Sequence, residues 1–461
     1  MIMKYIKYIS IPLFLGLLFS CGKNETVNQK IVATVDSRNI TAAEFSFQYE
    51  LTPSKYTRLG KAESFDLILD GMINKILFAK EAQKMGLDDD PEIKKIIEHH
   101  KHYAIIRELY KKHVRDSIEV TEEELRSAFR KSKITLFVKH FITTNSDEAY
   151  RISKGLETVP HIPLLDVSKT REIGDYGVVD IISWNEVNRE IEDILFHLPL
   201  LKLSEPYFDG KIYHIFRVVN KEMDAMQTEG EFVARKSSIT KAIRKRKEHY
   251  AAFDFVKRAM QPQNLMIKAE PLNSLTEIAW NNYNKNGIKL ENLKYEEVGN
   301  LFDNKRELLS EKLAMYQDGS MTVEDFIFTY KLNPVNISFK NKSSVRKGLE
   351  NAVAIYVRDR IFVAMGLQEN LDKLPPVTEE ARIWEERLLS NSLKQKIFNE
   401  LAETIFDSTE LVGKYDSTIS ELLSNLRGKV NIKINKEELY AVQTTDSGLP
   451  RKIDFFAIHT Q

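Results

Sequence analysis

Two segments of this 461-residue chain repeat a pattern that limits the folds open to it. Residues 45–53 (FSFQYELTP) and 326–334 (FIFTYKLNP), 281 positions apart, agree at five of nine positions. The tripeptide Met-Gly-Leu occurs at 85–87 and again at 365–367, almost in phase with the first identity. Between these landmarks, apolar residues recur at three- and four-residue spacing, which predicts helices. The sequence therefore predicts a duplicated helical module.

The segment between the two copies has a different hydrophobic period. From 134 to 138 apolar residues alternate with others, as in a half-buried strand. Asp209-Gly210 separates two strand-like runs at 205–208 and 212–219, and this dipeptide is typical of a hairpin turn. With 18 Gly and 13 Pro the chain is poor in turn formers, which favours long helices elsewhere. We expect an α+β fold: two mostly helical modules with one small mixed domain between them.

The charge balance and the cysteine count exclude several classes of protein. The chain has 67 Lys and Arg against 67 Asp and Glu, so it offers no electrostatic basis for nucleic-acid binding. The single cysteine, Cys21, excludes an intramolecular disulfide and every metal site that needs several cysteines. No Walker loop, Gly-x-Ser-x-Gly or His-Glu-x-x-His motif occurs, so nucleotide and hydrolase chemistry have no support. We expect no cofactor and no metal, and we expect His99, His100 and His102 to lie on a solvated helix face.

The first 21 residues have the pattern of an export signal. Lys4 and Lys7 precede an apolar run at 9–19, which is too short to span a bilayer as a helix. The following Leu18-Phe19-Ser20-Cys21 resembles a bacterial lipobox, which implies that Cys21 is lipidated and becomes the first residue of the mature protein. An ordinary signal peptide with an incidental cysteine is the alternative. We expect a lipid-anchored protein of the cell envelope that faces the periplasm or the cell exterior, with the outer membrane favoured.

These patterns divide the chain into eight segments. In order they are a signal peptide (1–20), a tether (21–30), a first helical module (31–133), a mixed domain (134–222), a closing helix of the first module (223–270), a linker (271–310), a second helical module (311–434) and a C-terminal tail (435–461). We interpret the run Val430–Ile434 as the counterpart of the strand at 134–138.

The helical modules have the order of elements of a known family. A short strand, a capped helix and a long helix that ends in Met-Gly-Leu resemble the chaperone module of SurA- and PrsA-type foldases. In those proteins a parvulin domain follows the module, and a long helix after it folds back to close the chaperone body. Residues 231–268 resemble that closing element. The resemblance implies binding of unfolded exported polypeptides without ATP.

The mixed domain at 134–222 resembles a parvulin prolyl isomerase. Its motifs occur in the family's order: VKHFI at 138–142, DEA at 147–149, GDYG at 174–177, FHL at 196–198, LSEP at 203–206 and YHI at 213–215. The resemblance places His140 and His214 at the two histidines of the parvulin site. The family's Cys or Asp falls on Val167, and Asp166 takes this role if the shortened loop is shifted. The apolar residues that hold the proline map near Val179, Trp184 and Ile191.

This set of residues implies weak or absent isomerase chemistry. A prolyl isomerase holds proline in an apolar site and favours the twisted amide over the planar one. Val167 can neither hydrogen-bond nor carry charge, so the implied site is degraded. For His140 and His214 the structural alternative is a pair of satisfied core histidines that brace two strands.

Three functions stay open on the sequence. The first is a lipid-anchored chaperone or foldase that binds unfolded exported or outer-membrane proteins, with the parvulin-like domain as a second peptide-binding surface. The second is an active prolyl isomerase that uses His140, Asp166 and His214. The third is a structural lipoprotein of an envelope assembly that binds one fixed partner.

Overall fold

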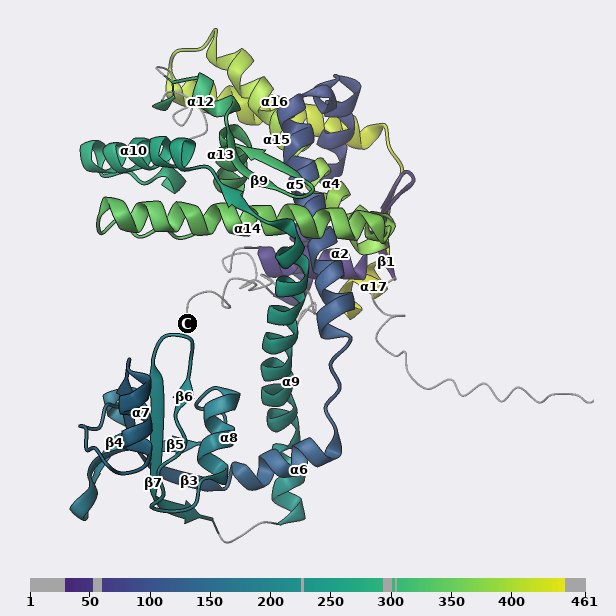
Figure 1. Cartoon of the computed structure of the whole chain (residues 1–461). Coiled ribbons are helices and arrows are strands. Elements are labelled where there is room, and N and C mark those ends of the chain that lie inside the picture. Colours follow the sequence, from purple (N-terminus) through teal and green to yellow (C-terminus); the bar gives the residue numbers. More distant parts are fainter. Residues whose placement is uncertain (1–29, 53–59, 225–227, 293–300, 303–304, 444–461) are drawn as a thin grey trace, which may run out of the picture. The chain divides into compact units, whose positions relative to one another are not determined.

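The computed structural model describes residues 30–443, except 53–59, 225–227, 293–300 and 303–304 (Figure 1). The expected signal peptide, its Cys21 and the end of the expected tail lie outside these residues. The described chain forms two units. The helical unit comprises 30–108, 267–313 and 321–443, and the sheet unit comprises 109–266 and 314–320.

The helical unit contains both copies of the duplicated module. The first copy consists of β1 (Ile31–Val35), β2 (Arg38–Thr41), α2 (Ala42–Leu51), α4 (Lys61–Lys84) and α5 (Pro91–Tyr110). The second copy consists of β9 (Lys312–Tyr316), β10 (Gly319–Thr322), α13 (Val323–Leu332), α14 (Lys342–Gln368) and α15 (Pro375–Ala402). The order of elements is the same, so the predicted duplication is confirmed. The chain passes between the units within α5, β8 (Met266–Ile267), β9 and β10.

The first helix of each copy has a threonine as its N-cap, but only the second copy completes a capping box. The side chains of Thr41 and Thr322 each accept a hydrogen bond from the backbone N–H three residues on. The carboxylate of Asp325 accepts a hydrogen bond from the backbone N–H of Thr322, which completes a capping box. In the first copy, buried Arg38 binds both carboxylate oxygens of Glu44. Only half of the box therefore forms there.

Each copy packs its third helix against the other copy. Leu389 and Leu393 of α15 belong to one buried cluster with the residues of α2 and α4. In return, α5 packs on the second copy: Asn333 donates a hydrogen bond to the Tyr103 hydroxyl, and Ile105 lies directly against Gly366 of α14. The third helices are therefore exchanged between the copies, apart from the start of α5, where Ile93 and Ile97 join the core of the first copy.

The two exchanged helices also contact each other. His100 and Trp384, each the tenth residue of its helix, stack with ring centroids 3.5 Å apart. Arg107 pairs with Glu380. The solvated face expected for the histidines is wrong for His100, and also for His99, whose ring packs on Tyr103. The reason is that a helix of the other copy covers this face.

The strand at 430–434 closes the first copy. β11 (Ile432–Ile434) pairs with β1 in a sheet of order β11-β1-β2. Asn435 donates its N–H to the carbonyl of Val32, just as Lys268 donates to Leu313, which is 281 residues beyond Val32. The counterpart of β11 is therefore β8 (Met266–Ile267), and the expected equivalence with 134–138 is wrong. The end of the segment expected to close the first module (223–270) thus pairs with the second copy instead, because β8 and Lys268 bond to β9.

The expected linker and tail carry helices of the core. Within 271–310, α10 (Ala269–Asn286) buries Leu272, Leu275 and Ala279, and α12 spans Glu307–Ser310. α10 lies beside α14, to which Arg346 and Asn273 bond it (Figure 1). In the tail, α17 (Lys436–Ala441) buries Leu439 in the core of the first copy, which α16 (Ser408–Gly428) also joins. A linker is wrong for 271–286, because its apolar residues recur on one helical face.

The sheet unit is built on five antiparallel strands. They are β3 (Ile134–Thr143), β4 (Thr170–Ile173), β5 (Gly177–Ser183), β6 (Tyr207–Phe208) and β7 (Tyr213–Met223), in the order β4-β5-β3-β7-β6. The hairpin expected at Asp209-Gly210 is confirmed by the pairing of β6 with β7. α7 (Ser146–Ser153) packs on Ile215 on one face of the sheet. α8 (Arg189–His197) packs on Val138 and Phe216 on the other.

Two further helices of the sheet unit pack together. α6 (Glu122–Lys131) and α9 (Glu229–Met260) meet through Phe129 and Phe232. Helical modules and one small antiparallel sheet together make an α+β fold, and this prediction is confirmed.

Candidate functional site

Two histidines from neighbouring strands meet on the α8 face of the sheet. The register of β3 and β7 places His140 opposite Phe216 and His214 opposite Ile142. Residues two apart on a strand share a face, so both imidazoles lie on one side of the sheet. Both side chains are buried, and their rings are nearly parallel with centroids 5.2 Å apart. We call His140 and His214 the histidine pair.

Polar atoms line up through the two rings. His140 Nε2 lies 2.9 Å from His214 Nδ1, and His140 Nδ1 lies 2.8 Å from the carbonyl oxygen of Ile162. At the other end, His214 Nε2 lies 3.2 Å from Asp209 Oδ2, an ion-pair distance without the alignment of a hydrogen bond. The histidine pair therefore links a main-chain carbonyl to a carboxylate.

These contacts determine which ring nitrogens of the histidine pair are donors. The Ile162 carbonyl only accepts, so His140 Nδ1 carries a proton and donates it there. The bond between the rings holds a second proton, between His140 Nε2 and His214 Nδ1.

The pKa values of His140 and Asp209 are both shifted. Desolvation lowers the pKa of His140 to about 4, against a weaker opposing effect of the Ile162 carbonyl. Hydrogen bonds from the backbone N–H groups of Ile212 and Lys211 are the main cause that lowers the pKa of Asp209 to about 2. At neutral pH the His140 ring is therefore neutral and the Asp209 carboxylate is ionised.

Asp166 does not join the histidine pair. It is exposed, and its carboxylate accepts the backbone N–H of Ser168, which lowers its pKa. None of the hydrogen bonds and ion pairs described for this part of the chain links it to His140 or His214. The structure thus brings His140 and His214 together and places Asp166 at the surface, where it bonds within its own loop.

A different carboxylate, Asp180, adjoins His140. It lies on β5 opposite Val138, is fully buried, and accepts the N–H of Leu164 at 3.0 Å. Its Oδ2 lies 4.0 Å from Nε2 of His161, whose Nδ1 accepts the backbone N–H of His140. Burial raises the pKa of Asp180. The sequence signal that could have identified it is a carboxylate inside the apolar run 178–182.

The three apolar residues expected to hold a proline do not gather at the pair. Ile191 of α8 packs in the core on the histidine face. Val179 packs with Phe137 and Val219 on the opposite face, because strand neighbours alternate. Trp184 joins the cluster of α6 and α9. The expected grouping is therefore wrong for Val179 and Trp184.

An open depression adjoins the histidine pair instead. Its volume is about 360 Å³, and it is lined by Ile194, His197, Leu198, Pro199, Ser204, Glu205, Pro206 and Tyr207. Tyr207 pairs with His214 across β6 and β7, with ring centroids 6.0 Å apart. Leu200, Leu201 and Phe208, which adjoin the lining residues in sequence, are exposed. The chain thus offers a shallow, mostly apolar surface beside two buried histidines.

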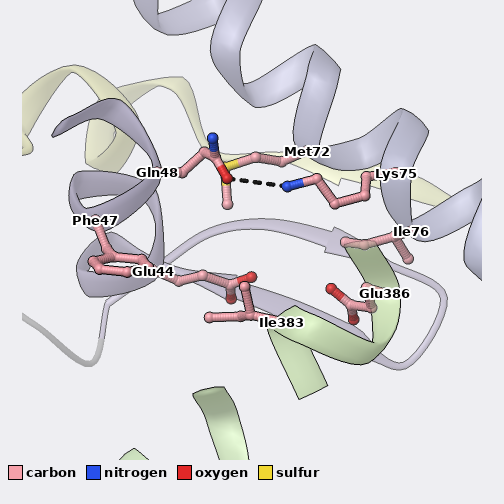
Figure 2. Close-up of a pocket in the computed structure, with 8 residues that line it drawn as sticks. All are labelled: Glu44, Phe47, Gln48, Met72, Lys75, Ile76, Ile383 and Glu386. Atoms are coloured by element: carbon pink, nitrogen blue, oxygen red, sulfur yellow. Dashed lines mark hydrogen bonds between the residues drawn. The ribbon is translucent and has the colours of Figure 1, made fainter. Parts of the chain in front are cut away.

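A second cavity lies in the helical unit, between α2, α4 and α15. Figure 2 shows Lys75 reaching across it to Gln48, with the carboxylates of Glu44 and Glu386 also on its wall. Its volume of about 10 Å³ is that of roughly one water molecule. Arg38 binds both Glu44 and Glu386, each at 2.6 Å. These charges connect the exchanged α15 to the first copy and leave no room for a substrate.

The described residues supply neither a metal site nor a membrane-spanning helix. Among them, no group of three or more His, Cys, Asp or Glu is arranged to hold a metal ion. No helix in the described ranges has the length and apolar character needed to cross a bilayer. Cys21, the expected lipidation site, lies outside these ranges.

No protein-family profile matches the chain, and no curated protein matches it. Similar solved structures are SurA-like chaperones and PrsA foldases, the classes that its sequence patterns resemble. One is a Campylobacter jejuni structure from a study of the virulence factor PEB4 and the periplasmic protein Cj1289, described as SurA-like chaperones. It is 16% identical to this chain, with a TM-score of 0.22, and the match covers 50% of this chain and 96% of the Campylobacter chain. The PrsA peptidylprolyl isomerase of Bacillus anthracis is 18% identical, with a TM-score of 0.21, over 40% and 88%. The PrsA foldase of Streptococcus pneumoniae is 13% identical, with a TM-score of 0.20, over 49% and 90%. Because these overlaps are partial, we base the functional proposal on the side chains themselves.

Proposed function

We propose that this protein is an exported, lipid-anchored chaperone that binds unfolded polypeptides, and that its sheet unit is a peptide-binding surface with weak or no isomerase activity. The observation that carries the proposal is the open apolar depression beside the histidine pair, with Leu200, Leu201 and Phe208 exposed next to it. Large exposed apolar side chains around a concave surface mark a place for another polypeptide.

The openness of this surface suits many different clients. An enclosed pocket selects one ligand shape, whereas a shallow apolar depression accepts short apolar segments of varied sequence. Each such contact is weak, and several along one unfolded chain add up through avidity. Binding of this kind needs no nucleotide. Anchoring through Cys21 would keep the surface at the membrane where exported chains emerge.

A second candidate function, prolyl isomerisation, has one observation in its favour: the histidine pair lies next to the depression. Of the carboxylates around the pair, Asp180 is fully buried and binds the N–H of Leu164, so a bound amide cannot reach it. One oxygen of Asp209 accepts two backbone N–H groups of its own hairpin turn, which holds that carboxylate in place. We therefore expect isomerase activity to be weak or absent.

The test of the chaperone function is suppression of aggregation by the full chain in detergent. A chemically unfolded test protein is diluted into it, and light scattering is followed. Leu200→Glu/Leu201→Glu should reduce the suppression at least twofold, because it charges the surface beside the depression. The control is Leu156→Glu, which charges an even more exposed leucine after α7. Equal effects of both variants, or binding of one fixed partner in stoichiometric amount without any suppression, would contradict the proposal.

The isomerase alternative is tested by exchange spectroscopy on a short Xaa-Pro peptide. Uncatalysed exchange takes tens to hundreds of seconds, so weak catalysis is visible. We expect the peptide signals to shift or broaden without faster exchange. Exchange that His140→Ala abolishes would establish the isomerase instead. The anchor is tested separately, since Cys21→Ser should release the protein from membranes.

A further inference from the structure

A segment of the sheet unit lies against His140. Residues Val159–Leu165, with the sequence VPHIPLL, run between α7 and β4, and we call them the strap. The strap contains two Xaa-Pro bonds, Val159-Pro160 and Ile162-Pro163. Both Ile162, which is 40% exposed, and Pro163 lie at the surface. The strap therefore places an exposed Ile-Pro pair over the buried side chain of His140.

Main-chain groups hold the middle of the strap. Ile162 donates its N–H to the carbonyl of His140 at 2.9 Å and accepts from His140 Nδ1 at 2.8 Å. Two residues on, the N–H of Leu164 binds the buried carboxylate of Asp180 at 3.0 Å. The carbonyl that His140 binds is that of the Ile162–Pro163 amide itself. His140 and Asp180 thus bind an aliphatic–Pro–aliphatic segment through hydrogen bonds to its backbone.

The strap takes an edge that the sheet leaves open. β5 pairs with β3 from Thr135 to Val138 and no further, so His140 lies beyond the end of that ladder. Ile162 occupies this place with a main-chain bond. Peptides that bind to a sheet edge use the same kind of contact: backbone hydrogen bonds give affinity and side-chain sites give selectivity.

We propose that the strap is an internal ligand, and that the edge at His140 and Asp180 is a binding site for an extended aliphatic–Pro–aliphatic segment of another polypeptide. Such a segment binds by displacing the middle of the strap. This inference rests on the proposed function, since it names the segments that the sheet unit selects. The backbone contacts require an extended segment, and the residues that make them in the strap, Ile162-Pro163-Leu164, supply its sequence class.

The packing of the strap fits displacement of its middle and retention of its ends. Val159 packs with the cluster under α7, and Leu164 and Leu165 pack with the core under α8. Ile162 and Pro163 are exposed, whereas the His161 side chain is buried and accepts the backbone N–H of His140. Displacement of the middle therefore exchanges the hydrogen bonds of His161 and Ile162 for those of the incoming segment. An internal ligand reduces the apparent affinity for an external one by the fraction of time that the site is free.

The first test uses the unmodified full chain in detergent and the acetylated, amidated heptapeptide Val-Pro-His-Ile-Pro-Leu-Leu. Hydrogen exchange of the backbone amides is followed with and without excess peptide. We expect the amides of Ile162 and Leu164 to exchange at least threefold faster with peptide, because the peptide takes their acceptors. Peptide that binds while both amides keep their protection would overturn the proposal, as would no binding of the peptide at all.

The second test frees the site without altering His140 or Asp180. Ile162→Gly/Pro163→Gly loosens the strap, and we expect it to bind the fluorescent heptapeptide about tenfold more tightly in an anisotropy titration. Leu156→Gly, an exposed leucine just before the strap, is the matched control and should change nothing. Adding His140→Phe to the loosened strap should remove the gain. No gain, or a gain that survives His140→Phe, would overturn the proposal.

The two proposals can fail separately. If the strap variants leave peptide binding unchanged while the full chain still suppresses aggregation, the strap proposal fails and the chaperone proposal stands. If Leu200→Glu/Leu201→Glu leaves aggregation suppression intact while the strap variants gain affinity, the strap proposal stands and the depression is not the client surface.

Discussion

His140 Nε2 lies 2.9 Å from His214 Nδ1, and this bond joins two strands of the sheet through their side chains. At one end His140 Nδ1 donates to the Ile162 carbonyl, and at the other His214 Nε2 lies 3.2 Å from the Asp209 carboxylate. The two buried rings therefore connect the strap to the turn of the β6–β7 hairpin.

The first prediction concerns the Asp209 carboxylate beside His214. Backbone N–H groups of Ile212 and Lys211 are the main cause that lowers the pKa of Asp209 to about 2. A carboxylate with a lowered pKa contributes stability that is complete above its ordinary pKa and is lost as the pH falls toward 2. We expect Asp209→Asn to destabilise the sheet unit at pH 7 and to lessen the loss of stability in acid, as measured by urea unfolding at pH 7, 4 and 3. Equal stability of the variant and the unaltered protein at pH 7 would contradict this contribution.

The second prediction concerns stability in acid. Burial lowers the pKa of His140 to about 4 from an unfolded value of 6.5. Its contribution to stability is complete above pH 6.5 and is lost as the pH falls toward 4, because the unfolded chain takes up the proton first. We expect the sheet unit to lose about 3 kcal/mol of its free energy of unfolding from this group by pH 4. Urea unfolding at pH 7, 5 and 4 checks this, and His140→Gln should flatten the dependence. An equally steep dependence in His140→Gln would exclude this residue as the cause.

The third prediction concerns the approach of the exchanged helix α5 to α14. A Cβ added at Gly366 would overlap Cγ2 of Ile105, a branched side chain that cannot swing away. We expect Gly366→Ala to destabilise the helical unit by about 1–3 kcal/mol. Gly71→Ala in the equivalent helix α4 meets nothing within 4 Å and should stabilise by about 0.5–1 kcal/mol. Chemical unfolding of both variants decides the matter, and the same sign of change in both would refute the close approach.

The fourth prediction concerns the buried charges at the other exchanged helix. Arg38 is 8% exposed and binds Glu44 and Glu386. Burial is the main cause that raises the pKa of Glu44, and Arg38 opposes it. Arg38→Met leaves these carboxylates without their partner and should cost about 3–5 kcal/mol at pH 7. The cost should shrink in acid, where Glu44 takes up a proton. As control, Arg346→Met removes an exposed pair with Glu350 and should cost less than about 1 kcal/mol.

The sequence by itself determined the local elements of this protein. The repeat at 45–53 and 326–334 predicted two helical copies. Asp209-Gly210 predicted the hairpin of β6 and β7, in which Tyr207 pairs with His214. Both signals are local: a helical stripe and a turn dipeptide depend on neighbours within a few residues. Strand alternation and the order of the motifs were also enough to single out His140 and His214. The α+β fold follows from these signals together.

Only the tertiary structure decided which elements meet. A third helix needs the same apolar stripe whether it packs on its own copy or on the other, so the exchange of α5 and α15 leaves no trace in the periodicity. The repeated Met-Gly-Leu shows the same limit. Gly86 ends α4 with a positive φ of 71°, whereas Gly366 lies inside α14 and lets Ile105 approach. Likewise, spacing along the chain pointed to Asp166, while the pairing of Val138 with Asp180 placed a different carboxylate beside His140. Contacts between distant segments depend on the pairing of strands and helices, and that pairing is settled only when the whole core packs.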